Sequence, residues 1–166
     1  MSKRPRVSIQ EADFDVSAEL HQLRAGDGGV GAAVVFVGTV RDRNEGQGVT
    51  AMTLEHYPGM TERSIDAMID QAIHRFALRA VRVIHRVGPL QPQDQIVLVA
   101  VTSAHRGEAF QGCEFLMDYL KMAAPFWKKE TAPDGSSRWV DARCSDDDAA
   151  RRWGLTLPDD TPGAPA

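Results

Sequence analysis

The sequence has little cysteine and no long apolar run. Only Cys113 and Cys144 occur among 166 residues, and they form no CxxC pair. This spacing excludes the disulfide framework of a small secreted domain and provides no zinc motif. The basic N-terminus is not followed by the apolar stretch of a signal peptide, and no run reaches the roughly 18 apolar residues of a membrane helix. We therefore expect a cytoplasmic protein without a membrane span.

The sequence also lacks an excess of positive charge. It has 19 Lys and Arg against 23 Asp and Glu, a net charge of −4, and only 7% aromatic residues. A nucleic-acid-binding domain needs a basic face, so this class is disfavoured. An anionic ligand must instead meet a local cluster of cations. The five histidines form no HxH or HExxH pattern, and we expect neither a bound metal nor a cofactor.

The rest of the composition is that of an ordinary globular domain, with 43% hydrophobic and 25% charged residues. A chain of this length can bury a core without a metal or a disulfide. We expect one domain over residues 1–153. The final stretch, 154–166, is rich in Pro, Gly and Asp, which predicts a disordered tail.

Apolar periodicity predicts both strands and helices. Strands are expected at 6–10, 32–37, 50–57, 80–87 and 95–102, and helices at 16–24, 61–77 and 106–122. A Pro-Asp-Gly turn predicts a hairpin over 126–131 and 138–142, and a last helical turn is expected over 146–152. This order is typical of an α+β, or mixed α/β, domain, and the pattern alone leaves its topology open.

Several residues carry expectations about burial. The apolar run at 32–37 (AAVVFV) is typical of a strand buried on both faces. Two strand histidines, His56 and His85, are interpreted as packed or hydrogen-bonded, and His74 as exposed. The helix at 106–122 is predicted to bury Ala109, Phe110, Cys113, Leu116, Met117 and Leu120.

Four stretches at the ends of elements concentrate unusual residues: 38–41, 56–61, 103–106 and 121–130. In the third, His105 and Arg106 open a helix, whose first N–H groups favour an anion. Cations at a helix start oppose the helix dipole unless an anion is bound, which points to function. The alternative is a solvated arginine beside a capping histidine.

The fourth stretch contains two separated lysines. Lys121 ends a helix, Pro125 stops that helix, and Lys128 lies on the next strand. Strand alternation puts Lys128, and not Lys129, on one face with Glu130. Lysines held near other cations or away from water can serve as acids, bases or nucleophiles. From spacing alone, two ordinary surface lysines remain the favoured interpretation.

Five motifs in order carry a family resemblance. They are LEHYPGMTE at 54–62, VIHRVG at 83–88, TSAHR at 102–106, MDYLK at 117–121 and APFWKKE at 124–130. Together they resemble the large, catalytic subunit of molybdopterin synthase, over about residues 7–153. Several linked motifs in register are more specific than any one of them.

The resemblance implies a sulfurtransferase of molybdenum cofactor biosynthesis. Such an enzyme converts cyclic pyranopterin monophosphate into the dithiolene of molybdopterin. The sulfur comes from a small ubiquitin-like subunit whose C-terminal Gly-Gly tail carries a thiocarboxylate, which agrees with the absence of an obvious catalytic cysteine. The family assembles as a heterotetramer around a homodimer of large subunits. Its fold is an α/β hammerhead with an additional antiparallel β portion.

The resemblance also implies roles for individual residues. Lys121 and Lys128 match the catalytic lysines and also bind substrate. The remaining substrate-binding matches are Thr39, Val40, Arg41, His105, Arg106, Lys129 and Glu130. Thr39 stands where some family members have lysine, so a direct charge contact from that position is in doubt. His105 and Arg106 are candidates for acting across the dimer.

Two other functions stay open at this point. A cofactor-free transferase or hydrolase acting on another phosphorylated heterocycle would use the same cations. A non-catalytic scaffold that binds a ubiquitin-like tail would bind that tail tightly, with no turnover that depends on Lys121 or Lys128.

Overall fold

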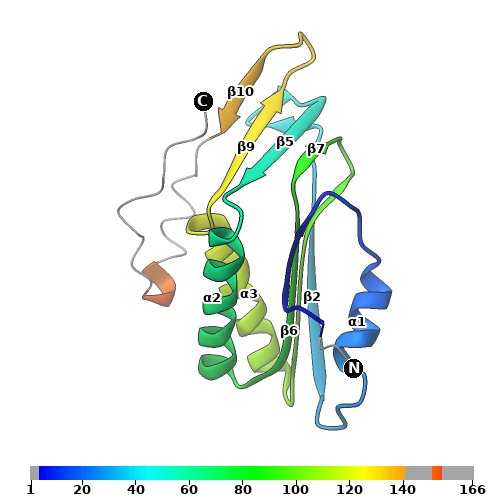
Figure 1. Cartoon of the computed structure of the whole chain (residues 1–166), viewed down its shortest axis with the longest axis vertical. Helices are drawn as coiled ribbons and strands as arrows, with labels where there is room; N and C mark the ends of the chain where they lie inside the picture. Colours follow the sequence, from blue (N-terminus) through cyan, green and yellow to red (C-terminus); the bar gives the residue numbers. More distant parts are fainter. Residues whose placement is uncertain (1–3, 141–150, 155–166) are drawn as a thin grey trace.

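The computed structural model describes residues 4–140 and 151–154. Its larger sheet has the order β1-β6-β8-β2. The strands are β1 (Val7–Gln10), β6 (Leu78–Arg86), β8 (Gln95–Ser103) and β2 (Ala32–Thr39). β1 runs parallel to β6, whereas β6 and β2 are antiparallel to β8. In Figure 1, α2 (Met60–Phe76) and α3 (Arg106–Met122) lie on one side of this sheet and α1 (Val16–Arg24) on the other.

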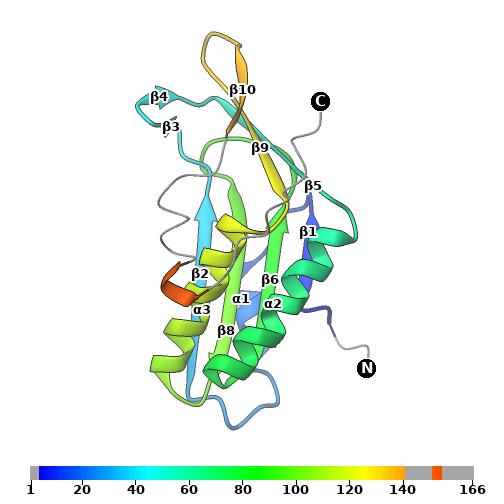
Figure 2. The same cartoon turned by 90° about the vertical axis from the view of Figure 1, so that its left-hand side faces the viewer.

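A second, fully antiparallel sheet of order β10-β9-β5-β7 stands above the first in Figure 1. Its strands are β10 (Ser137–Val140), β9 (Phe126–Thr131), β5 (Ala51–His56) and β7 (Gly88–Leu90). A small hairpin of β3 (Arg43–Asn44) and β4 (Gln47–Gly48) lies at the same end of the molecule (Figure 2). The expected α+β fold is confirmed.

Local sequence explains where the helices begin and end. Asp15 caps α1, its carboxylate accepting from the amide of Ala18 at 2.9 Å. At the start of α2 the contact runs in the opposite direction along the chain, since the Glu62 carboxylate, inside the helix, accepts from the amide of Gly59 at 2.7 Å. Gly59 has φ 83°, a conformation that glycine adopts without a steric penalty. Helix α3 ends three residues before Pro125, as predicted.

The main core lies between α2, α3 and the larger sheet. Its members include Ile65 and Ile69 of α2, Phe115 of α3, and Val99 and Val101 of β8, each at most 1% exposed. Complete burial of such a side chain contributes roughly 1.5–3 kcal/mol to folding. Cys113 belongs to this core as expected, and its thiol is free.

Two expectations about burial are wrong. The strand at 32–37 is not buried on both faces, because β2 is the edge of its sheet and pairs only with β8, leaving Val35 36% and Phe36 39% exposed. Phe110 is 62% exposed, because the buried stripe of α3 passes through Phe115 and Tyr119 instead. An apolar side chain does not by itself reveal which way a helix faces.

A short strand was also missed from the sequence. Gly88 and Pro89 begin β7, which pairs with β5, so the chain passes here from one sheet to the other. The remaining helix and strand predictions within 4–140 agree with the structure to within about two residues at each end. The part of the predicted last helical turn at 146–150, and the tail beyond Gly154, lie outside the described residues. Within the described residues, no helix is long and apolar enough to cross a membrane.

Candidate active site

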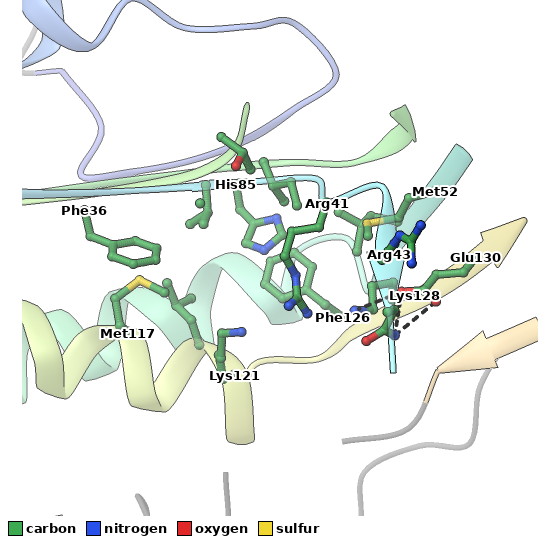
Figure 3. Close-up of a pocket in the computed structure, with 17 residues that line it drawn as sticks. Phe36, Arg41, Arg43, Met52, His85, Met117, Lys121, Phe126, Lys128 and Glu130 are labelled. Carbon is green, nitrogen blue, oxygen red and sulfur yellow. Dashed lines mark hydrogen bonds and ion pairs between the residues drawn. The ribbon is translucent and has the colours of Figure 1, made fainter. Parts of the chain in front are cut away.

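A cavity of about 400 Å³ opens where the two sheets meet. Figure 3 shows it between β6 and β8 on one side and the end of α3 and β9 on the other. Residues far apart in the sequence reach it from six places: β2 with the segment that follows it through β3, then β5, β6, β8, α3 and β9.

Four cationic side chains line this cavity: Arg41, Arg43, Lys121 and Lys128. Lys121 lies in the last turn of α3, where the helix dipole favours a cation. The segment after it turns into β9 at Pro125. Buried Thr61 holds that turn in place, since its hydroxyl donates to the Pro125 carbonyl at 3.1 Å. Both catalytic candidates are thereby held on one side of the cavity.

The two arginines come from the segment after β2. Regular pairing of β2 ends in a register shift between Gly38 and Thr39. A side chain at Gly38 would lie 2.7 Å from Val97, so only glycine fits this bend. Beyond it, the amide of Val40 donates to the Asp94 carbonyl at 2.9 Å. This anchor fixes the start of the segment that brings Arg41 to the cavity.

One carboxylate, Glu130 of β9, also lines the cavity and is 4% exposed. The side-chain amide of Asn44 donates to both of its oxygens, at 2.9 and 3.1 Å. Lys128 Nζ lies 3.5 Å from one oxygen, as Figure 3 shows, and an Arg138 nitrogen lies 3.8 Å from the other. Glu130 therefore links the β3 hairpin to Lys128. Its negative charge already interacts with Asn44, Lys128 and Arg138.

The other three cations of the cavity have no such partner. Within residues 4–140 and 151–154, neither Arg41, Arg43 nor Lys121 forms an ion pair with a carboxylate. Four cations thus face a single, already bonded carboxylate. Grouping them is unfavourable without a ligand, and an anion would form charge-assisted hydrogen bonds with them. The cavity is therefore suited to an anionic ligand.

Apolar and aromatic side chains form another wall of the cavity. His85 stacks on Phe126 with ring centroids 3.8 Å apart and 18° between the planes. Phe36 and Met117 extend this wall (Figure 3). Burial lowers the pKa of His85 to about 4, and the nearby His56 adds to the effect. The ring is therefore neutral at pH 7, which leaves the apolar wall without a charge.

Five of the predicted site residues meet in this cavity: Thr39, Arg41, Lys121, Lys128 and Glu130. Val40 does not line it, because its side chain is 2% exposed and packs in a small core with residues of β5 and β7. Lys129 faces away, with Nζ 5.8 Å from the Trp139 ring centroid. Alternation along β9 correctly separated Lys128 from Lys129.

His105 and Arg106 lie elsewhere. They begin α3 and line a separate, open depression beside Gly31. Lys121 is at the opposite end of this helix, roughly 24 Å away at 1.5 Å per residue. Within one chain, His105 and Arg106 therefore do not meet Lys121 and Lys128 in one cavity.

Sequence reasoning missed the apolar lining of the cavity and three of its polar residues: Arg43, His85 and Asn44. Arg43 follows Arg41 by two positions, a spacing that could have drawn attention to it. His85 lies within the VIHRVG motif but was interpreted only as a packed strand residue. Asn44 meets Glu130 across 86 positions of sequence, and no local signal reveals such a contact.

The fold is a mixed α/β domain, and its cavity is lined partly by cations and partly by apolar side chains. These features define a class of protein that binds an anionic small molecule and catalyses a reaction on it. More specifically, the chain belongs to the MoaE protein family, whose model matches residues 9–123. The "Molybdopterin synthase catalytic subunit" of Ralstonia nicotianae is 59% identical over 151 residues, which are 91% of this chain and 85% of that protein.

Solved structures agree with this assignment. A MoaE protein from Burkholderia ambifaria has a TM-score of 0.78 at 54% identity, covering 92% of this chain and all of that one. A molybdopterin synthase from Staphylococcus aureus has a TM-score of 0.76 at 29% identity, covering 84% of this chain and 99% of that one. The described fold is thus the fold of the family.

Proposed function

We propose that this chain is the catalytic subunit of a molybdopterin synthase. It transfers sulfur from the C-terminal thiocarboxylate of a small ubiquitin-like partner to cyclic pyranopterin monophosphate. The observation that carries the proposal is the cavity with four cations and one already bonded carboxylate. A phosphate and a thiocarboxylate must meet for this reaction, and on a chain of net charge −4 only a local cation cluster can hold both.

Each sulfur transfer has two parts. The thiocarboxylate sulfur forms a bond to a carbon of the substrate as the bond from that carbon to an oxygen breaks, and the departing oxygen takes up a proton. The partner's acyl group is then attached to the substrate through sulfur. Water then breaks the acyl carbon–sulfur bond, which leaves a carboxylate on the partner and the sulfur on the substrate. Two such transfers supply both sulfurs of the dithiolene.

We assign a different role in this reaction to each of three cations of the cavity. Lys121 has no ion-pair partner within the described residues, and we assign it the acid–base or covalent-amine role. Lys128, held by Glu130 at 3.5 Å, orients the substrate and stabilises the acyl-linked intermediate. Arg41 binds phosphate or the tail carboxylate.

The proposed assembly is a heterotetramer of two such chains and two small partners. In one chain, His105 and Arg106 lie at the far end of α3 from Lys121. If they bind the same substrate, they must come from the second copy. The proposed setting is the cytoplasm, in agreement with the free thiol of Cys113.

A reconstituted assay tests the proposal. Purified chain, thiocarboxylated partner and cyclic pyranopterin monophosphate are combined under anaerobic conditions, and dithiolene product is quantified. We expect Lys121→Ala and Lys128→Ala to lower the rate by about a hundredfold or more, since each removes a cation that acts on developing charge. Lys129→Ala is the matched control, because Lys129 lies on the other face of the same strand; its rate should stay within about threefold.

Other outcomes point to other functions. Tight binding of the partner tail without any product would identify a scaffold. Turnover of another phosphorylated heterocycle, with none of the pterin, would identify a different transferase or hydrolase. Failure of the wild-type chain to form any dithiolene overturns the proposal.

A further inference from the structure

His85 is held in a single orientation inside the cavity. Its Nδ1 lies 2.9 Å from the backbone carbonyl oxygen of Arg86, and its ring stacks on Phe126. Because a carbonyl oxygen only accepts, Nδ1 carries the proton in this bond. In the neutral ring Nε2 then has a free lone pair, which makes it a hydrogen-bond acceptor.

That acceptor has no partner within the described residues. Among residues 4–140 and 151–154, the only hydrogen bond of His85 is the one made by Nδ1, and Nε2 is not among the fully enclosed polar atoms. The side chain lines the same cavity as Arg41 and extends into it from β6 (Figure 3). Nε2 is thus available to a molecule bound there.

Such an acceptor is scarce in this cavity. The lining side chains that can accept a hydrogen bond are Thr39, Asn44, Glu130 and His85. The Asn44 amide nitrogen donates to both oxygens of Glu130, which holds these two side chains against each other, and Thr39 is exposed. The arginines and lysines only donate. On the aromatic wall, His85 is therefore the side chain that can recognise a donor.

We propose that Nε2 of His85 accepts a hydrogen bond from an N–H of the substrate's heterocycle, so that His85 is a positioning and specificity residue. This role rests on the proposed function. A pterin carries N–H and NH₂ donors along the edge of a flat ring, and the phosphate lies at the other end of the molecule. The cations bind the phosphate, while His85, stacked on Phe126, presents one acceptor at the edge of its ring to the substrate's heterocycle.

The surroundings keep this acceptor available. Burial lowers the pKa of His85 to about 4, with a smaller contribution from His56. Arg41, Lys121 and Lys128 also line the cavity and oppose a further positive charge. A neutral acceptor in a cavity full of donors accepts a substrate N–H without attracting the phosphate.

Two variants isolate Nε2. In His85→Asn the amide nitrogen can replace Nδ1 and keep the bond to Arg86, but nothing replaces Nε2. In His85→Gln the longer side chain brings an amide oxygen to the position of Nε2. Binding of cyclic pyranopterin monophosphate to the full chain is measured by titration calorimetry without oxygen. Binding of inorganic phosphate is followed by NMR as the matched probe.

We expect His85→Asn to weaken binding of the pterin phosphate about tenfold to a hundredfold, because a substrate donor loses its partner. Its affinity for inorganic phosphate should stay within about twofold, since the cations are unchanged. His85→Gln should recover most of the loss. Unchanged pterin binding in His85→Asn, equal loss with both probes, or no recovery in His85→Gln would each overturn the role of His85 and leave the proposed function intact. A wild-type chain that does not bind the pterin phosphate overturns both.

Discussion

The core of the larger sheet and the cavity above it share strands β6 and β8 and helix α3, yet they are built on opposite principles. In the core, Phe115 and Leu116 are at most 1% exposed, and the cluster consists of hydrophobic residues. In the cavity, at the end of the same helix, Lys121, Arg41 and Arg43 form no ion pair with a carboxylate within the described residues. Stability therefore resides mainly in the core, whereas the cavity holds cations together that repel one another until an anion binds.

The largest expected effect tests the core side of this contrast. Phe115 is fully buried and packs against Phe76 and Trp153, at 5.4 and 5.6 Å between ring centroids. Phe115→Ala should lower the free energy of unfolding by about 3–5 kcal/mol, measured by urea denaturation. Phe110→Ala, five positions earlier on the exposed face of the same helix, should change it by less than about 0.5 kcal/mol. Similar losses in both variants would contradict the assignment of the buried face.

The second effect is a pH dependence. His85 has a pKa of about 4 in the folded chain against 6.5 for an ordinary histidine. Below pH 6.5 the unfolded chain takes up a proton that the folded chain does not. The neutral ring therefore contributes about 3 kcal/mol to the free energy of unfolding above pH 6.5. This contribution should be lost as the pH falls from 6.5 to 4.

A comparison of variants isolates this contribution from other groups. The groups around the ring are His56, Arg41, Lys121 and Lys128, and all remain in His85→Phe. The wild type should lose more stability than His85→Phe on acidification, as measured by thermal melts at each pH. His74→Ala, which changes an exposed histidine, should follow the wild type. Parallel curves for wild type and His85→Phe would show that burial does not keep His85 neutral.

A third effect concerns the one carboxylate of the cavity. Glu130→Gln keeps the shape but removes the charge that Asn44, Lys128 and Arg138 share. We expect a loss of about 1–3 kcal/mol in unfolding free energy, partly restored by phosphate, which replaces the missing negative charge. Glu114→Gln is the control: its pair with Arg152, at 2.6 Å, is exposed on both sides and should contribute less than about 1 kcal/mol.

The core was predictable from the sequence to a degree that the cavity was not. Apolar periodicity and capping residues located α1, α2 and α3, because these signals act within a few residues. The exposed edge of β2 was not predictable, because strand order depends on pairings such as β2 with β8 that no local pattern encodes. The same holds for Asn44 and Glu130, which meet only after the two sheets have formed.

The individual site residues also differ in whether a local sequence pattern could predict them. Alternation along β9 was enough to prefer Lys128 over Lys129, and family motifs were needed to single out Lys121. The separation of His105 from Lys121 could have been predicted, because a 17-residue helix places its two ends more than 20 Å apart, at roughly 1.5 Å per residue. His85 was interpreted as packed, which is correct, but a packed histidine can also leave one nitrogen open to a cavity.

The smallest expected effect on stability also tests most directly whether the core and the cavity have separate roles in stability and function. Lys121 gains from the dipole at the end of α3 and loses through proximity to the other cations of the cavity, two terms of similar size and opposite sign. Lys121→Met should therefore shift the unfolding free energy by less than about 0.5 kcal/mol, while dithiolene formation falls by about a hundredfold or more. Urea denaturation and the reconstituted assay on the same preparations measure both. A loss of stability comparable to that of Phe115→Ala would mean that Lys121 supports the fold. The cations of the cavity would then contribute to stability without a ligand.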